Sequence, residues 1–578
     1  MSVKNQKPQV FTRKRRRGSF QAEFALGSFH HQLASHVGGV VYGAHVAAQA
    51  FHRAMLRYSN VERWELFAAP FDFERAGREI KALGRGKTRI KNINVHKFNE
   101  LSAGLEGNRL TAWHSIHADQ TPFLLRHLFA RTLYPVTLTH HTISYASMLH
   151  RWFLPLLLAD AYPCDAVVCT STAARQAVSN LLAYVKEEFD RAYGTKLEFG
   201  GRLQVIPLGV DTEIFRPRNK AKLRERLGLP RDAFLIMWLG RVSATDKADL
   251  LPLLSVFRQL VRDHPGRRLR LLICGTPQEH YADIVRHYAQ ALGLGRRVVI
   301  RKEIDPEARH LFLAAADIFV APTDNIQETF GQTPVEAMAC GTPQVVSDWN
   351  GYRDTVRHGQ TGFLVPTRWM KSDEDLRGLN AITHDSGFQH LALAESVVVD
   401  LRAFQDYLQA LIVNDSLREG MGRCARARAR DTFSWETVIG RYEELWLELA
   451  RMARRLKLRE ARENARMSYL HPSFTNLFAH YATGLISDQA RLRLTATGRR
   501  VLEGEEGLPS FQELSEVLQT DLLCEALELL GRQRRPASLS RLVKTLGRKG
   551  DYLSDHTRRH LLWLLKYGFA ELAEEGKI

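Results

Sequence analysis

Two glutamates, Glu328 and Glu336, stand eight positions apart on either side of a tight turn, Phe330-Gly331-Gln332-Thr333. Pro334 follows at a position typical of the first turn of a helix, where its missing N–H is tolerated. The free N–H groups and positive dipole of a helix N-terminus bind anionic ligands. A carboxylate just before such a turn can hold sugar hydroxyls while the amides hold phosphate.

Two cations follow a neighbouring apolar segment. Residues 235–239 predict a strand that enters Gly240-Arg241, and Lys247 lies six positions beyond Arg241. Arginine binds a diphosphate as a bidentate fork and lysine binds it as a point charge. Taken alone, solvated surface charges would be the better interpretation. The glutamate pair at a nearby strand end makes diphosphate binding the favoured hypothesis.

Short apolar strands alternate with helices on both sides of residue 216, which predicts two parallel, doubly wound sheets of the α/β class facing a cleft. The predicted strands cover residues 113–115, 135–139, 166–169 and 204–207, then 235–239, 269–273, 298–300, 318–320 and 344–347. Ligands bind such sheets at the carboxyl ends of strands, where His141 and Gly209 are expected. Gly39, in a Gly-Gly turn before a predicted helix over 42–58, offers a weaker signal of the same kind.

Composition and charge limit the function classes. The chain has 578 residues, a net charge of +18 and six cysteines without metal-type spacing, which favours reduced thiols in the cytoplasm. Residues 1–100 carry 18 Lys/Arg against 7 Asp/Glu, so an anionic substrate or a peripheral contact with an anionic membrane surface fits. A solubilising basic tail at 13–17 is the alternative. Without an apolar run of about 18 residues, no membrane span is expected.

The last hundred residues predict a separate, mainly helical domain that resembles a winged helix. Predicted helices over 538–546 and 554–567 place Arg558, Arg559 and Lys566 where a DNA-reading helix would have them. However, residues 451–578 carry 22 Lys/Arg against 16 Asp/Glu, a weak excess for nucleic-acid binding. Docking of a protein partner or self-association through 471–578 is therefore favoured over nucleic-acid binding, and a plain helical bundle stays open.

Several motifs together resemble the retaining glycosyltransferases of family 4, which have the GT-B fold. They are Glu328-Thr-Phe-Gly-Gln-Thr-Pro-Val-Glu336, Gly351-Tyr-Arg-Asp354, Gly359-Gln-Thr-Gly-Phe-Leu-Val-Pro366, Val205-Ile-Pro-Leu-Gly-Val-Asp211, Gly240-Arg241 with Lys247, Thr139-His-His141-Thr142 and Phe433-Ser-Trp435-Glu436. The resemblance covers roughly residues 30–450 and implies two Rossmann-like domains. The implied organisation is a basic arm (1–25), an acceptor domain (26–215), a donor domain with crossover helices (216–450), a charged helical linker (451–470) and the helical domain (471–578).

The resemblance also implies roles for the site residues. Arg241 and Lys247 would neutralise the diphosphate of a nucleotide diphosphate sugar, and Glu328 would bind the sugar hydroxyls. Glu336 would hold the ribose, and His141 would lie beside the reacting carbon. Gly39, Gly240 and the amides of Phe330, Gly331, Gln332 and Thr333 would complete the donor site. A hexose-like unit would be transferred with retention, without a cofactor or a required metal.

The acceptor is left open between a glycan, a lipid, a metabolite and a peptide. Asp354 replaces a glutamate frequent in the family, and the Arg241–Lys247 spacing of six exceeds the commoner five. Asp373 and Asp375 lie in a polar insertion, 368–390, and are not interpreted as a metal site. The alternative function is a non-catalytic sugar-nucleotide-binding protein or regulator acting through 471–578. An epimerase or phosphorylase fits the glutamate spacing less well.

Overall fold

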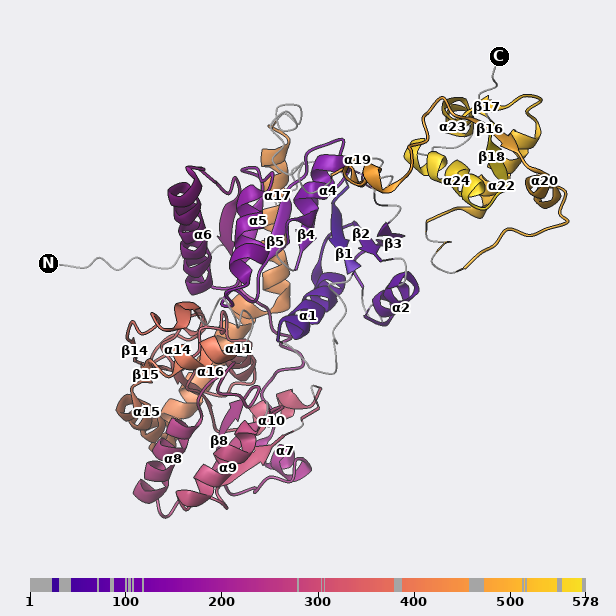
Figure 1. Cartoon of the computed structure of the whole chain (residues 1–578). Coiled ribbons are helices and arrows are strands. Elements are labelled where there is room, and N and C mark those ends of the chain that lie inside the picture. The colour runs from indigo at the N-terminus through magenta and orange to yellow at the C-terminus, as the bar shows by residue number, and fades with distance from the viewer. Residues whose placement is uncertain are drawn as a thin grey trace. The chain divides into compact units, whose positions relative to one another are not determined.

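The computed structural model describes residues 23–30, 43–69, 72–83, 88–98, 101, 105, 109–116, 119–277, 280–302, 304–305, 307–378, 387–456, 472–511, 514, 517–547 and 554–573. The contacts divide the chain into two compact units (Figure 1). Unit 1 comprises Met1–His96 with Ala103–Arg466, and unit 2 comprises Lys97–Ser102 with Met467–Ile578. Unit 1 holds two large sheets flanked by helices, as the alternation of strands and helices predicts, and a small two-stranded sheet.

The first sheet of unit 1 has seven strands in the order β3-β2-β1-β4-β5-β6-β7, and its pairings from β2 through β7 are parallel. Its strands are β1 (Ala25–Phe29), β2 (Arg63–Ala68), β3 (Asn92–Lys97), β4 (Ala112–Ser115), β5 (Val136–Thr139), β6 (Ala166–Cys169) and β7 (Arg202–Val205). The helices among them are α1 (Gly43–Tyr58), α2 (Phe73–Leu83), α4 (Thr121–Phe129), α5 (Leu154–Leu158) and α6 (Thr172–Tyr193), with the π-helical turn η4 (Leu149–Phe153) before α5.

The second sheet has six parallel strands in the order β10-β9-β8-β11-β12-β13. They are β8 (Phe234–Leu239), β9 (Leu269–Cys274), β10 (Val298–Arg301), β11 (Ile318–Ala321), β12 (Gln344–Ser347) and β13 (Phe363–Val365). The helices are α7 (Lys220–Arg226), α8 (Leu251–Asp263), α9 (Tyr281–Ala291), α10 (Arg309–Ala315), α11 (Gln332–Ala339), α12 (Tyr352–Thr355) and α14 (Gly387–Ala394), and β14 (Thr367–Trp369) pairs antiparallel with β15 (Val397–Val399).

Alternate residues of the second sheet point to opposite faces, as strand geometry requires. On β8, Leu235 and Met237 join a core with α10, α11 and α16 (Asp415–Phe433), whereas Ile236 and Trp238 join a core with α8, α9 and α15 (Leu401–Val413). Helices on both faces explain why these strands are continuous apolar runs that the sequence makes easy to predict.

The last helix of unit 1, α17 (Trp435–Ala453), returns to the first sheet. Trp435, Tyr442 and Trp446 are buried in one core with Trp64 of β2 and Phe51 of α1. The Tyr442 hydroxyl lies 3.0 Å from the Thr139 hydroxyl at the end of β5. The two sheets of unit 1 are therefore joined by packing as well as by the chain. In the part of the chain that the structure describes, no helix is long and apolar enough to cross a membrane.

Three strands of the first sheet were not predicted. β1 begins at Ala25, inside the stretch interpreted as a basic arm, and it is buried at the centre of the sheet although its sequence is Ala-Leu-Gly-Ser-Phe. A Cβ on Gly27 would lie 2.5 Å from the Trp113 ring, so the small residue makes room for that indole. β2 and the partly exposed β3 lack a continuous apolar run. β7 also begins two residues before the predicted strand at 204–207.

Unit 2 has a three-stranded antiparallel sheet in the order β17-β16-β18 and its own apolar core. Its elements are α19 (Phe474–Leu477), η6 (Ala479–Tyr481), β16 (Arg491–Leu494), α20 (Ala496–Leu502), α22 (Thr520–Gly531), β17 (Ala537–Ser538), α23 (Leu539–Gly547), α24 (Ser554–Lys566) and β18 (Ala570–Leu572). The winged-helix resemblance stays a prediction. Most of the predicted linker, residues 457–470, lies outside the described residues.

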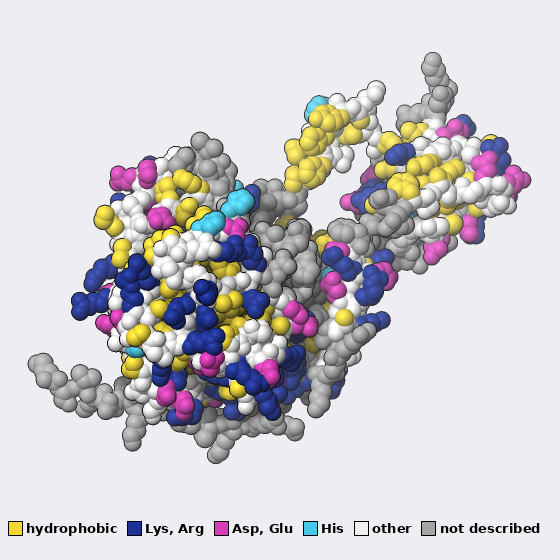
Figure 2. Space-filling model, turned by 90° about the horizontal axis from the view of Figure 1, so that it is seen from below, with side chains coloured by type: hydrophobic (Ala, Val, Ile, Leu, Met, Phe, Trp, Pro, Cys, Tyr) yellow, Lys and Arg dark blue, Asp and Glu magenta, His cyan; other side chains and the backbone are white. Residues whose placement is uncertain are grey.

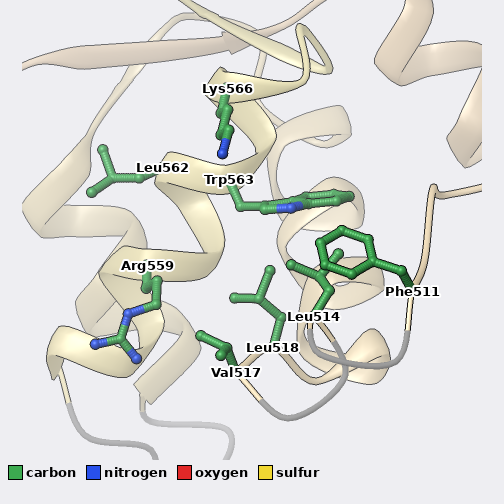
Figure 3. A pocket seen from close by; sticks show the side chains of 8 residues that line it. All are labelled: Phe511, Leu514, Val517, Leu518, Arg559, Leu562, Trp563 and Lys566. Atoms are coloured by element: carbon green, nitrogen blue, oxygen red, sulfur yellow. The ribbon is translucent and has the colours of Figure 1, made fainter.

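The three basic residues predicted for a DNA-reading helix do not form one cationic surface. The Arg558 guanidinium binds both carboxylate oxygens of Asp488, at 3.0 and 3.1 Å, and one of Asp555 at 2.7 Å. Arg559 and Lys566 instead border an apolar groove, in which Trp563 and Phe511 face each other (Figure 3).

Candidate functional site

Glu328 lies in the loop between β11 and α11, folded back onto its own backbone. Its Oε1 accepts N–H groups from Thr329 and Phe330 at 3.2 Å and from Gly331 at 2.9 Å. Lys247 Nζ donates to Oε2 at 3.2 Å. Burial acts to raise the pKa of Glu328, but the Lys247 charge and the amides outweigh it and leave the pKa below its ordinary value. Glu328 is therefore an anion at neutral pH.

The loop after β12 holds the main chain around Glu328. Asn350 Nδ2 donates to the Glu328 carbonyl at 2.6 Å, and Asn350 adopts a left-handed φ of 35° to do so. A Cβ on Gly351 would lie 2.5 Å from the Phe330 Cα. Gly331 has a φ of 91°, and a Cβ there would lie 2.3 Å from the Tyr352 ring. Glycine is thus required on both sides of this backbone contact.

Arg241 is held by two side chains that the sequence did not single out. Its guanidinium donates to Asp246 at 3.0 Å and to Gln327 Oε1 at 3.2 Å. His390 Nδ1 lies 3.8 Å from the other Asp246 oxygen, and His390 Nε2 lies 3.4 Å from the Ser144 carbonyl. His390 is the last residue of the polar insertion, so that end of the insertion packs beside the candidate site.

Glu336 on α11 is 2% exposed and faces Arg309 of α10 at 2.9 Å. Burial raises the pKa of Glu336, and the Arg309 charge partly opposes the increase. Arg309 also lies over the Phe215 ring, 5.5 Å from its centroid. Arg309 was missed because no local pattern in the sequence links it to a glutamate 27 positions later.

Loops of the first sheet meet the Glu328 loop directly. The Thr329 hydroxyl donates to the His141 carbonyl at 3.2 Å, and the Ser171 hydroxyl donates to the Thr329 carbonyl at 2.6 Å. Gln332 Nε2 donates to the Gly209 carbonyl at 2.9 Å. The structure thus brings His141, Gly209 and the Glu328 loop together, as the carboxyl ends of strands in both sheets would require.

Asp354 makes a further contact between the two halves of unit 1. Its carboxylate accepts the Thr172 backbone N–H at 2.5 Å and the Thr172 hydroxyl at 2.6 Å. Thr172 is the first residue of α6, and Ser171 caps that helix by accepting the Ala174 N–H. A carboxylate at a helix N-terminus is stabilised by the macrodipole and by the unsatisfied N–H groups there.

The other predicted site residues have varied positions. Gly240 follows β8, and its N–H donates to the Cys274 carbonyl at 3.1 Å. Phe330 is buried against Phe433, with the ring centroids 6.1 Å apart. Thr333 lies in the first turn of α11, and Gly39 lies outside the described residues. Among the residues that the structure describes, no cluster of three or more His, Cys, Asp or Glu could hold a metal ion.

The arrangement can bind an anionic, hydroxyl-bearing ligand. Cationic Arg241 and Lys247 and the start of α11 suit a diphosphate, while the Glu328 and Glu336 carboxyl groups suit hydroxyl groups. The Phe330 and Gly331 N–H groups donate hydrogen bonds to Glu328 in this structure. Their predicted contacts with a ligand therefore stay predictions.

The region around the second sheet is similar in sequence to known proteins. Residues 219–390 match the family model described as Glycosyl transferases group 1. A D-inositol 3-phosphate glycosyltransferase of Nocardia farcinica is 32% identical over 257 residues, which cover 41% of this chain and 55% of that protein. The corresponding enzyme of Geodermatophilus obscurus is 36% identical over 174 residues, covering 29% and 37%. The chain thus spans about half the length, or less, of these relatives.

The comparison with solved structures found matches of low sequence identity. Anabaena HepE in complex with UDP has a TM-score of 0.48 and 16% identity, covering 73% of this chain and 98% of that one. Sucrose-phosphate synthase from Thermosynechococcus elongatus has a TM-score of 0.47 and 18% identity, covering 74% and 100%.

Proposed function

We propose that this protein is a retaining glycosyltransferase that uses a nucleotide diphosphate sugar and requires no metal. The observation that carries the proposal is the contact between Lys247 and Glu328 beside the start of α11. Lys247, which suits a diphosphate, and Glu328, which suits sugar hydroxyls, meet there at the carboxyl ends of the strands. The group 1 match over residues 219–390 supports the same conclusion.

In the proposed reaction, the bond between the anomeric carbon and the diphosphate oxygen breaks, and its electron pair stays on the diphosphate. Arg241 and Lys247 neutralise that charge, the electrophilic role a metal would otherwise fill. The acceptor hydroxyl attacks from the face that the diphosphate leaves and passes its proton to a diphosphate oxygen. Glu328 orients the sugar through its hydroxyls, and His141 lies beside the reacting carbon.

The acceptor is proposed only as a hydroxyl-bearing molecule. The relatives named above are D-inositol 3-phosphate glycosyltransferases, so a phosphorylated polyol is the first acceptor to test, before glycans, lipids and peptides. The basic first hundred residues also favour an anionic acceptor, because a positively charged surface attracts anions.

A thermal-shift panel of nucleotide diphosphate sugars tests the donor half of the proposal. A ligand that binds the native state raises the melting temperature with the logarithm of its saturation. We expect one donor to raise the melting temperature of the wild type but not of Arg241→Ala. The matched control is Arg175→Ala, an exposed arginine on α6 that should retain the shift. Absence of a shift with every donor would contradict the proposal.

A further inference from the structure

The tripeptide Gly-Arg-Arg occurs immediately before two neighbouring strands of the second sheet. Residues 266–268 precede β9 and residues 295–297 precede β10. β9 and β10 are parallel and hydrogen-bonded, with Val298 paired to Leu271 and the Leu271 N–H donated to the Arg297 carbonyl at 2.9 Å. The repeat therefore places arginines from both turns at the same edge of the sheet.

These arginines line a pocket. Its walls include Arg268, Arg270, Arg296 and Arg297, together with Gln290. Arg270 is the second residue of β9, and the register places it beside Arg297. Arg270 and Arg297 are half-buried, while Arg268 and Arg296 are exposed at the rim. Four guanidinium groups in one hollow provide fork-shaped donors that match phosphate oxygens.

The positive charge of the pocket is only partly neutralised. Asp232 binds Arg268 through both carboxylate oxygens, at 2.7 and 2.8 Å. Among the described residues, no carboxylate forms an ion pair with Arg270, Arg296 or Arg297, and the buried Arg270 Nε has no hydrogen-bond partner. Burial and the charges of Arg268 and Arg297 lower the pKa of Arg270, and the charge of Asp232 only partly opposes the decrease.

The pocket is distinct from the candidate donor site. Arg241 and Glu328 follow the carboxyl ends of β8 and β11, whereas the Gly-Arg-Arg turns precede the amino ends of β9 and β10. Because all these strands are parallel, one site lies at the carboxyl ends of the strands and the other at their amino ends. The two ends are about 20 Å apart for a strand of six residues. Figure 2 views unit 1 from the end where α8 and α9 lie and shows Lys and Arg side chains gathered across it.

The geometry points to a second anion site in this pocket, which binds two or more phosphate groups carried on one molecule or side by side on a lipid surface. A single phosphate would engage one or two of the four guanidinium groups and leave the others uncompensated. The two sources share this chemistry, so binding of a soluble polyphosphate and binding of an anionic bilayer are distinguished by experiment.

The test uses the full-length protein with two probes. Inorganic pyrophosphate is titrated by calorimetry, and vesicles of phosphatidylcholine, with and without phosphatidylglycerol, are tested by co-sedimentation. We expect at least one probe to bind and the double variant Arg296→Gln/Arg297→Gln to weaken it about tenfold or more, since each charge-assisted hydrogen bond contributes roughly a decade in affinity. Arg534→Gln/Arg535→Gln, an exposed pair in unit 2 with the same charge change, should bind as the wild type does.

The outcomes separate the alternatives. Pyrophosphate binding that is lost in the double variant but retained in Arg241→Gln would assign the site to the pocket and not to the donor site. Binding of phosphatidylglycerol vesicles alone would support the inference with a bilayer as the source. Absence of binding to both probes, or equal loss in both double variants, would overturn it. The single variant Arg296→Gln, at an exposed position, guards against an effect of misfolding.

Discussion

The Lys247 ammonium lies 3.2 Å from Glu328 Oε2, and the other oxygen of that carboxylate accepts three backbone N–H groups. The two residues are 81 positions apart, on loops that follow strands β8 and β11. A carboxylate held in this way keeps both its charge and its orientation. Under the proposed function, a carboxylate fixed in this way would orient the sugar with little reorganisation of the loop during the reaction.

Glu328→Gln tests that arrangement, because glutamine has the same shape without the charge. We expect sugar transfer to fall about 100-fold or more, in the range found when one pre-organised electrostatic contact is removed, while the fold is retained. Initial rates at saturating donor measure the effect. Glu187→Gln, on the exposed face of α6, is the control and should retain full activity. Wild-type rates in Glu328→Gln would exclude a catalytic role for the carboxylate.

Asp324 lies four residues before Glu328, and its raised pKa leads us to predict that the stability depends on pH. Burial and the charge of Asp249 raise its pKa to about 8, although the Asp249 N–H opposes the increase. The folded state therefore holds this proton more tightly than the unfolded state. Its contribution is complete below the ordinary pKa of an aspartate and is lost as the pH rises through about 8. In that window the free energy of unfolding should fall by up to about 1.4 kcal/mol per pH unit.

Denaturant unfolding at several pH values between 6 and 9 measures this slope. The Asp324→Asn substitution replaces the protonated carboxyl group with an amide of the same size that does not titrate. The contribution of this residue to the slope should therefore disappear. Asp305→Asn, at an exposed position, should leave the slope as in the wild type. An identical slope in Asp324→Asn and the wild type would show that another group is responsible.

The second sheet is more predictable from sequence than the first. Its strands β8, β9 and β12 are covered on both faces, so they appear as apolar runs, and α11 ends where Gly341 adopts its left-handed φ of 72°. By contrast, β1 is a central strand made of small residues that fit around Trp113. Packing of that kind is decided by a residue far along the chain, and no local pattern contains it.

The same distinction applies to the candidate site. Glu328, Glu336, Arg241 and Lys247 could be singled out because their types and spacing are informative in combination. Their partners could not be identified, since His390 approaches Asp246 only after α14 has packed beside the site. Burial is also absent from the sequence, so the raised pKa of Glu336 was not predictable.

Asp354→Asn tests the contact between the two halves of unit 1. Loss of the charge weakens the interaction with the Thr172 N–H and with the macrodipole of α6, and should cost about 1 kcal/mol. Hydrogen exchange followed by mass spectrometry should show faster exchange in the first turn of α6. Asp190→Asn, near the other end of the same helix, is the control, and equal exchange in both variants would contradict the role given to Asp354.

Removal of divalent metal tests the proposed mechanism by a treatment that should leave the activity unchanged. With EDTA present throughout purification and assay, turnover should stay within about twofold of the untreated enzyme, because arginine and lysine supply the positive charge. Added magnesium or manganese should not restore or raise activity. A loss of activity that either ion reverses would establish a metal requirement and contradict this part of the proposal.

The Arg126–Asp165 pair tests what holds the first sheet together. Both side chains are buried, and the guanidinium meets the two carboxylate oxygens at 2.6 and 2.8 Å. Asp165 also accepts the Val136 N–H at 2.7 Å, which ties the start of β5 to the residue before β6. Arg126→Met would leave this carboxylate buried without its cation, so we expect the free energy of unfolding to fall by about 3–5 kcal/mol.

Chemical denaturation measures this loss, and Arg175→Met, at an exposed position on α6, should change stability by no more than about 0.5 kcal/mol. The double variant Arg126→Met/Asp165→Asn removes both charges while keeping an oxygen that can accept the Val136 N–H. It should be more stable than Arg126→Met alone, because the penalty comes from the isolated buried charge and not from the missing contact. A double variant that is less stable than either single change would show that the pair acts through packing and hydrogen bonds instead.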